Sequence, residues 1–476
     1  MPRAFARVPG LYNRRDMTRG RISLFLISLF ALGLGGSAAC RKPASRPNVI
    51  FILLDTLRSD RLSAYGYGKP TTPNLDAFAR GGVLFEQARS QASCTFPSVN
   101  SILTSRWPLH FLGQPGDRIG IPKEYPALQE ILKASGYQTL AVTASPIVRK
   151  SPSHHNLYGG FDRGFDVFDE TCHIRRANCV NRRADHHLNR LGKGPLFLYL
   201  HYMDVHSAYI PPSPWKERFV EAYPEARPWI LKGNPRPIRR SLTGEGRKVE
   251  MSPRDVAYMS GLYDGELAYL DDQLRELFAD LKHRGLLDTS IVIVAADHGE
   301  EFMEHGRMIH CEVLYDTSVH VPMIVRLPPE LRPTGEKAAG RIAALVENLD
   351  LTPTILDYLG IKAPGPLDGK SLRPLIEEGT PLHDTSFALQ YALRSATDGK
   401  SKLIFDQGTG KFELHDLASD RFEQKDVLAA DRRTYFALRK KLEVRMTALE
   451  GGFATKGSLD AAREGERQLK ALGYLQ

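Results

Sequence analysis

Two acidic side chains follow apolar runs that are typical of buried strands. Asp297 and His298 come directly after residues 291–296, and Asp55 follows residues 48–54. Runs of this length that are rich in β-branched residues predict strands of a sheet, and the carboxyl ends of parallel strands meet at one edge. We therefore expect the three side chains to lie together at that edge, where carboxylates and an imidazole suit a divalent cation.

A hydroxyl group at the start of a predicted helix adds a nucleophile to this set. Pro97 suits the first turn of a helix, so Thr95 is expected just before the helix N-terminus, where the dipole and free N–H groups favour an anion. If its oxygen also touches a cation held by Asp55, Asp297 and His298, the metal favours the alkoxide. Taken singly, these residues are equally good turn formers or helix caps, so the prediction depends on the whole set.

The elements expected to position these residues alternate along the chain. Strand-like and helix-like runs follow one another from Asn48 onward, which predicts an α/β fold with a largely parallel sheet. A leucine pattern at near-helical spacing predicts a helix over residues 253–284, with Asp271 and Asp272 on its exposed face. Residues 207–252 are rich in Pro, Gly, Arg and Lys, so we expect a surface insertion that rims a substrate pocket or is merely solvated.

Composition narrows the class of protein and the kind of partner. The chain has 476 residues, 42% of them hydrophobic and 25% charged, which excludes a disordered chain and a polytopic membrane protein. Its formal charge of +9 favours an anionic partner, either a substrate or a membrane surface. Because the surplus charge is spread along the chain, nucleic acid is not expected as a partner.

Residues 1–40 have the layout of a bacterial export signal. Arginines precede the apolar stretch 22–36, and small residues then lead to Cys40 as in a lipobox, whose cysteine becomes lipidated. An uncleaved anchor helix and an ordinary cleaved signal peptide are the alternatives. All three place the protein outside the cytoplasm, and the first two attach it to a membrane. Residues 41–46 are expected to form a linker.

The other four cysteines are expected in an oxidising compartment. Cys172 and Cys179 are close in sequence, so a small disulfide loop is plausible, with two free thiols as the alternative. Cys94 and Cys311 each adjoin a candidate active-site residue. The sequence does not decide whether they pair.

The order and spacing of several motifs resemble the sulfatase family of the alkaline phosphatase superfamily. Besides 55–60, 95–98 and 297–302, the matching segments are 65–67, 72–76, 160–166, 201–206, 321–324, 350–354 and 414–420. The resemblance covers residues 47 to about 430. It implies a three-layer α/β sandwich around a central, mostly parallel sheet, with a catalytic domain at 47–375, and a smaller α+β subdomain with a helical tail at 376–476.

The resemblance also implies roles for individual residues. Asp55, Thr95, Asp297 and His298 match metal-ligand positions of a single-metal or compact two-metal site, and Thr95 matches the nucleophile. Two further histidines, His201 and His206, match residues that bind the ester oxygens, and His206 also matches one that assists the leaving group. His310 lies at the position of a functional histidine in phosphoethanolamine-transferring relatives, so the same two roles are expected of it.

The departures from the family pattern change the expected chemistry. Sulfatases carry Cys-x-Pro-Ser-Arg, whose cysteine becomes formylglycine, whereas this chain has Thr95 at the cysteine position and Val99 at the arginine position. No formylglycine is therefore expected, and a threonine nucleophile resembles relatives that handle phosphodiesters. His298 replaces the asparagine of many calcium-binding sulfatases. Imidazole favours manganese or zinc, with calcium or magnesium as the alternatives.

Three functions follow as expectations. The first is a metal-dependent hydrolase of sulfate or phosphate esters in the bacterial envelope, periplasmic or at the cell surface, acting on a glycan, a lipid or a small molecule. The second is a phosphotransferase of the phosphoethanolamine or phosphoglycerol type. The third is a catalytically inactive module that binds sulfated or phosphorylated polymers.

Overall fold

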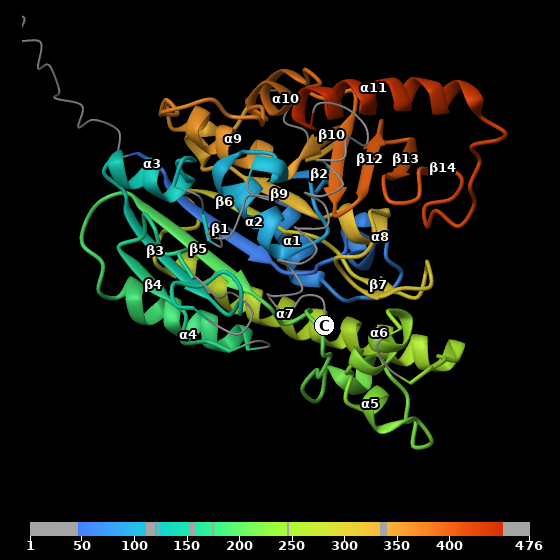
Figure 1. The fold of residues 1–476 in the computed structure, drawn as a ribbon. Coiled ribbons are helices and arrows are strands. Elements are labelled where there is room, and N and C mark those ends of the chain that lie inside the picture. Colours follow the sequence, from blue (N-terminus) through green and yellow to red (C-terminus); the bar gives the residue numbers. More distant parts are fainter. Residues whose placement is uncertain are drawn as a thin grey trace, which may run out of the picture. The chain divides into compact units, whose positions relative to one another are not determined.

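An eight-stranded sheet forms the centre of the fold (Figure 1). The computed structural model describes residues 46–110, 120–121, 123–152, 159–173, 176–244, 247–333 and 340–450. The strand order is β10-β2-β9-β6-β1-β5-β3-β4, and β9 alone among these strands runs antiparallel to its neighbours. The predicted export signal with Cys40, the linker except for its last residue, and residues 451–476 of the predicted tail lie outside the described residues.

The apolar runs of the sequence form the central strands. β1 (Asn48–Leu54) lies between β5 (Leu196–Tyr202) and β6 (Ser290–Ala295) and pairs in parallel with both. Their side chains are buried on both faces, which is why these segments lack a polar alternation. The remaining strands of the sheet are β2 (Val83–Arg89), β3 (Gln138–Thr143), β4 (Val167–Asp169), β9 (Met323–Arg326) and β10 (Arg341–Glu347).

Helices cover both faces of the sheet, so the expected three layers are present. α4 (Ala177–Leu188) and α7 (Pro253–His283) pack together on one face, and α2 (Thr95–Thr104), α3 (Leu128–Ala134) and α9 (Leu351–Tyr358) lie on the other (Figure 1). α7 agrees with the predicted helix to within one residue, and Ser252 caps it by accepting the N–H of Asp255. Three further helices are α1 (Pro73–Arg80), α8 (Asp316–Val319) and α10 (Arg373–Glu378).

One surface prediction is wrong. The Asp271 side chain is only 2% exposed, since it packs against the start of α1. Its carboxylate accepts the backbone N–H groups of Asn74 and Leu75 there. It therefore supplies partners that the first turn of α1 lacks internally. The leucine spacing of α7 does not reveal this contact, because the partner helix lies almost 200 residues earlier in the chain.

The insertion at 207–252 contains two short helices, α5 (Pro228–Leu231) and α6 (Arg236–Leu242). Both are shorter than the stretch over which helical periodicity can be detected, so the sequence pattern does not show them. α6 contacts β8 (Met308–Ile309), which pairs with β7 (Glu301–Phe302). The insertion therefore reaches the segment that carries His310.

A second, antiparallel sheet forms the C-terminal subdomain. Its strands are β11 (Ser386–Gln390), β12 (Leu393–Thr397), β13 (Ser401–Asp406) and β14 (Lys411–Asp416), and α11 (Arg432–Glu450) packs against β12 and β13. The boundary at residues 375 and 376 stays a prediction. Within the described ranges, every helix is too short or too polar to span a lipid bilayer.

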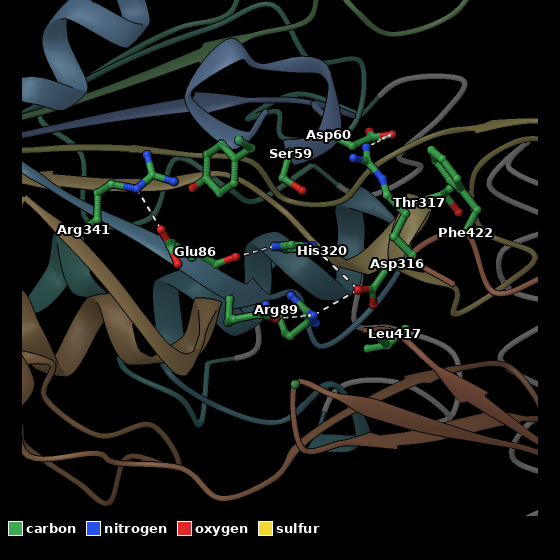
Figure 2. A pocket seen from close by; sticks show the side chains of 14 residues that line it. Ser59, Asp60, Glu86, Arg89, Asp316, Thr317, His320, Arg341, Leu417 and Phe422 are labelled. Carbon is green, nitrogen blue, oxygen red and sulfur yellow. Dashed lines mark hydrogen bonds and ion pairs between the residues drawn. The ribbon is translucent and has the colours of Figure 1, made fainter. Parts of the chain in front are cut away.

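A cavity of about 340 Å³ lies where this subdomain meets the main sheet (Figure 2). Its charged walls are neutralised in pairs: Arg89 contacts Asp316 at 3.0 Å, and Arg341 contacts Glu86 at 2.7 Å. The predicted site residues do not line it. The cavity therefore lies apart from the predicted site, in the packing between the two sheets.

Candidate active site

The carboxyl ends of β1 and β6 bring the predicted metal ligands together. Asp55 follows β1 and Asp297 lies two residues beyond β6, and the ligand atoms of Asp55, Asp297 and His298 all lie within 4.8 Å of one another. All three side chains are fully buried. Their proximity follows from the parallel pairing of β1 with β6, in which Leu53 lies opposite Ala295.

The donor atoms fit a divalent cation. Asp55 Oδ1 and Asp297 Oδ2 are buried and have no hydrogen-bond partner among the described residues, a costly arrangement unless a ligand occupies the site. His298 Nδ1 donates to the carbonyl oxygen of Gly299 at 2.9 Å, which leaves Nε2 with a lone pair for a metal. Two carboxylate oxygens and one imidazole nitrogen are therefore available.

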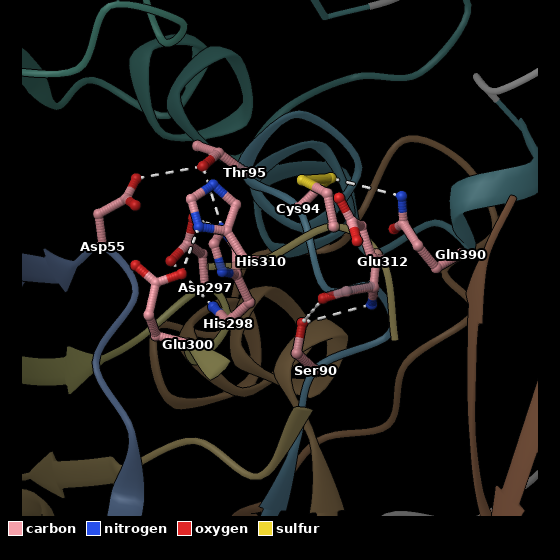
Figure 3. Close-up of a disulfide and its surroundings, with 12 residues drawn as sticks. Asp55, Ser90, Cys94, Thr95, Asp297, His298, Glu300, His310, Glu312 and Gln390 are labelled. Atoms are coloured by element: carbon pink, nitrogen blue, oxygen red, sulfur yellow. Dashed lines mark hydrogen bonds and ion pairs between the residues drawn. A yellow bond between two sulfur atoms is a disulfide. The ribbon is translucent and has the colours of Figure 1, made fainter. Parts of the chain in front are cut away.

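Thr95 lies within reach of these ligands. The Thr95 hydroxyl donates to Asp55 Oδ2 at 3.2 Å, and its oxygen, Oγ1, lies 3.1 Å from His298 Nε2 (Figure 3). Thr95 is the first residue of α2, and Cys94 is the N-cap in an extended conformation. The hydroxyl therefore lies at a helix N-terminus, where backbone N–H groups and the helix dipole stabilise negative charge.

A buried histidine orients Asp55. His201, fully buried at the end of β5, lies with Nε2 3.1 Å from Asp55 Oδ2, and Tyr199 OH lies 3.3 Å from its Nδ1. Burial raises the pKa of Asp55, but the hydrogen bond from His201 and the charges of His206 and His298 outweigh it and hold that pKa below its usual range. The contact with Asp55 favours an orienting role for His201, and its assignment to substrate binding stays a prediction.

The two remaining predicted histidines lie next to each other at the same edge. The ring centroids of His206 and His310 are 5.0 Å apart, and that of His310 is 4.6 Å from that of His298. Burial and the charge of His310 lower the pKa of His206 to about 4, and burial together with the charge of His298 lowers the pKa of His310. The two rings therefore form a cluster with His298, whose Nε2 contacts the Thr95 hydroxyl.

Glu300 is a site residue to which the sequence analysis gave no role. It is fully buried, and it accepts hydrogen bonds from His310 Nδ1 at 2.8 Å and from Tyr209 OH at 2.9 Å. The contact directs the other nitrogen of His310, Nε2, away from Glu300. Glu300 belongs to the quoted 297–302 motif, but nothing in the sequence names His310 as its partner.

Two further contacts around the site were also missed. Tyr199 and His201 are two residues apart on one strand and so share a face, a signal the sequence does contain. Arg239, from α6 of the insertion, lies 3.4 Å from Glu312, and its charge contributes to the lowered pKa of His310. The insertion therefore places a charged residue close enough to His310 to affect its pKa.

The four cysteines outside the export signal form two disulfides. Cys172 is bonded to Cys179, as the short spacing suggests, and Cys94 is bonded to Cys311. The second bond joins the residue before Thr95 to the residue after His310 (Figure 3).

Comparison with known proteins identifies the family and the fold of the chain. The model of the sulfatase family matches residues 47–361, well over half of the chain, and the model described as "N-sulphoglucosamine sulphohydrolase, C-terminal" matches residues 304–451. Among solved structures, a phosphonate monoester hydrolase of Agrobacterium radiobacter superposes with a TM-score of 0.67 at 20% identity, covering 85% of this chain and 96% of that chain. This likeness shows that the two proteins share a fold.

Curated relatives extend over most of the chain as well. It is 23% identical over 492 residues to the N-acetylglucosamine-6-O-sulfatase of Bacteroides thetaiotaomicron, a match that covers 85% of this chain and 87% of the relative. It is 26% identical to arylsulfatase A of Homo sapiens over 81% of this chain and 77% of the relative. The protein therefore belongs to the sulfatase family and is a hydrolase of the sulfuric-ester type with an alkaline-phosphatase-like fold.

Proposed function

We propose that this enzyme is a metal-dependent hydrolase of sulfate or phosphate esters that uses Thr95 as its nucleophile. The observation that carries the proposal is the position of the Thr95 hydroxyl, 3.2 Å from Asp55 Oδ2 and 3.1 Å from His298 Nε2 at the N-terminus of α2. A divalent cation bound by Asp55, Asp297 and His298 would favour the alkoxide form of that hydroxyl. Manganese and zinc suit His298 better than calcium or magnesium.

The residues of the chain supply the remaining steps. Thr95 Oγ1 forms a bond to sulfur or phosphorus as the bond to the leaving oxygen breaks, and the N–H groups at the start of α2 stabilise the non-bridging oxygens. The proton that Thr95 releases passes to the ring of His206 or His310, whose lowered pKa suits it to accept a proton, and from there to the leaving oxygen, while Glu300 orients the His310 ring. Water then cleaves the ester on Thr95 and restores its hydroxyl. Because Thr95 has no thiol, this route requires no formylglycine.

A panel of chromogenic esters tests the proposal. We expect the purified domain, supplied with manganese or zinc, to hydrolyse an aryl sulfate, an aryl phosphate or an aryl phosphodiester, with turnover measured by release of the phenol. Turnover of the aryl sulfate alone assigns sulfatase chemistry, and turnover of the aryl phosphate or the aryl phosphodiester assigns phosphoryl chemistry. No turnover on any of the three, with metal bound, would contradict the proposal.

The phosphotransferase remains the second candidate, because His310 occupies the position of a functional histidine in phosphoethanolamine-transferring relatives and lies beside His206. The same assay separates the two functions when glycerol or ethanolamine is added as an acceptor. A hydrolase releases free phosphate whether or not the acceptor is present. A transferase instead yields the phosphorylated acceptor at the expense of free phosphate.

We further propose that the enzyme is exported and attached to a membrane through lipid on Cys40. The support is the order of basic, apolar and small residues ahead of that cysteine. Cells that produce the full chain and are fed a labelled fatty acid are expected to yield labelled enzyme, and a Cys40→Ser variant is expected to carry no label. Equal labelling of both proteins would exclude Cys40 as the site.

A further inference from the structure

The Cys94–Cys311 disulfide links the two segments that carry the proposed nucleophile and one proposed acid. Cys94 directly precedes Thr95, Cys311 directly follows His310, and the two cysteines are 217 residues apart in sequence. A backbone hydrogen bond from Cys311 N–H to the Ser93 carbonyl, 3.0 Å long, runs beside the covalent link. The two segments are therefore joined at the residues next to Thr95 and His310 (Figure 3).

The backbone on both sides of His310 has an unfavourable conformation that surrounding contacts must hold in place. Ile309 has φ of 71° and Cys311 has φ of 76°, so both residues that flank His310 adopt left-handed conformations that branched and larger side chains disfavour. Conformations of this kind persist where surrounding contacts impose them. A hydrogen bond from Glu300 orients the His310 ring, and the disulfide fixes the backbone that follows it.

The other end of the link is equally constrained. Cys94 and Cys311 are buried, with exposed fractions of 0% and 1%, and Gln390 Nε2 from β11 donates to Cys94 Sγ at 3.4 Å. Cys94 is also the N-cap of α2, so its position sets where that helix, and with it Thr95, begins. Movement of the His310 segment would therefore displace Thr95, the proposed nucleophile.

We propose that the Cys94–Cys311 disulfide is a positioning element of the active site. It holds the His310 ring at a fixed position relative to the Thr95 hydroxyl, so full activity requires the oxidised form. The inference rests on the proposed roles of Thr95 and His310. A misplacement of about 1 Å between reacting groups can reduce the rate about 100-fold. The metal ligands Asp55, Asp297 and His298 come from other strand ends, so loss of the disulfide should leave metal binding intact.

A pair of double variants tests this role. In Cys94→Ala/Cys311→Ala, we expect kcat on the best aryl ester to fall about 10- to 100-fold, with KM and bound metal nearly unchanged. Cys172→Ala/Cys179→Ala is the matched control: it removes the other described disulfide, which closes a local loop with a sequence separation of 7, and should keep kcat. A disulfide that only stabilises the fold would lower the melting temperature and leave kcat within about twofold of the parent at 25 °C, and that result would overturn the proposal.

Chemical reduction keeps the test decisive if the first variant does not fold. In the Cys172→Ala/Cys179→Ala background, Cys94–Cys311 is the only described disulfide left for a phosphine reductant. Because the bond is buried, the protein is unfolded for reduction and refolded with the reductant present, beside a sample refolded with the bond intact. We expect a lower kcat in the sample in which two thiols are titrated after unfolding, and recovery on reoxidation. Unchanged kcat after both thiols appear counts against the positioning role alone, whereas turnover by a Thr95→Ala variant counts against the proposed function.

Discussion

Replacing Thr95 by alanine is expected to abolish turnover while the protein stays folded and keeps its metal. The substitution removes the oxygen that lies 3.2 Å from Asp55 Oδ2 and 3.1 Å from His298 Nε2, and no other hydroxyl bonds to these two side chains among the described residues. Loss of a covalent nucleophile typically lowers kcat by more than about 1000-fold. Steady-state assays on the best ester, with metal analysis of the same sample, measure the effect.

Two further variants separate loss of the nucleophile from damage to the helix. Thr95→Ser keeps the oxygen and removes only a methyl group, so we expect it to retain most of the activity. Thr104→Ala removes a hydroxyl from the other end of α2, where it donates to the Asn100 carbonyl, and should be nearly silent in kcat. Full activity in Thr95→Ala would show that another group attacks the ester, whereas equal losses in all three variants would show damage to α2 and not loss of a nucleophile.

The sequence was sufficient to predict that Asp55, Asp297 and His298 lie together at one edge of the sheet, because local patterns determine their positions. Apolar runs become buried strands, and their parallel pairing brings Asp55 and Asp297 together without any specific knowledge of side-chain contacts. The same argument places His201, at the end of the adjacent strand, beside Asp55. Pro97 likewise marked the start of α2, although the helix begins at Thr95 itself.

Contacts between distant loops could not be predicted in this way. The pairing of Cys94 with Cys311, the bond from His310 to Glu300 and the burial of Asp271 depend on how loops and helices dock after the sheet has formed. No periodicity encodes these contacts, since each partner is an ordinary residue of its own segment. The sequence names the residues that do chemistry more readily than those that position them.

Substituting Asp297 by asparagine is expected to remove the metal and the activity with little change in the local backbone. Asp297 Oδ1 accepts the N–H groups of Thr56 at 3.1 Å and of His298 at 2.9 Å, and the amide oxygen of asparagine can keep both bonds. Oδ2, which has no hydrogen-bond partner among the described residues, becomes an NH₂ group that cannot bind a cation. Metal content measured by elemental analysis should therefore fall together with kcat, by about 100-fold or more.

A second carboxylate cluster provides the matched control. Glu347, Asp350 and His383 also bring three ligand atoms within 4.8 Å, but Asp350 Oδ1 accepts the Lys370 N–H, and Oδ2 accepts from Glu347 N–H and from His383 Nε2. Because hydrogen bonds already satisfy its oxygens, we expect Asp350→Asn to lower stability and leave metal content unchanged.

Chelation of the unsubstituted enzyme completes the comparison. Turnover should disappear with the metal and return more fully with manganese or zinc than with calcium or magnesium, because His298 contributes an imidazole nitrogen to the set. If Asp350→Asn loses the metal and Asp297→Asn retains it, the cation belongs to the other cluster. The Thr95 hydroxyl would then have to be activated without a metal, by Asp55 Oδ2 at 3.2 Å or by His298 Nε2 at 3.1 Å.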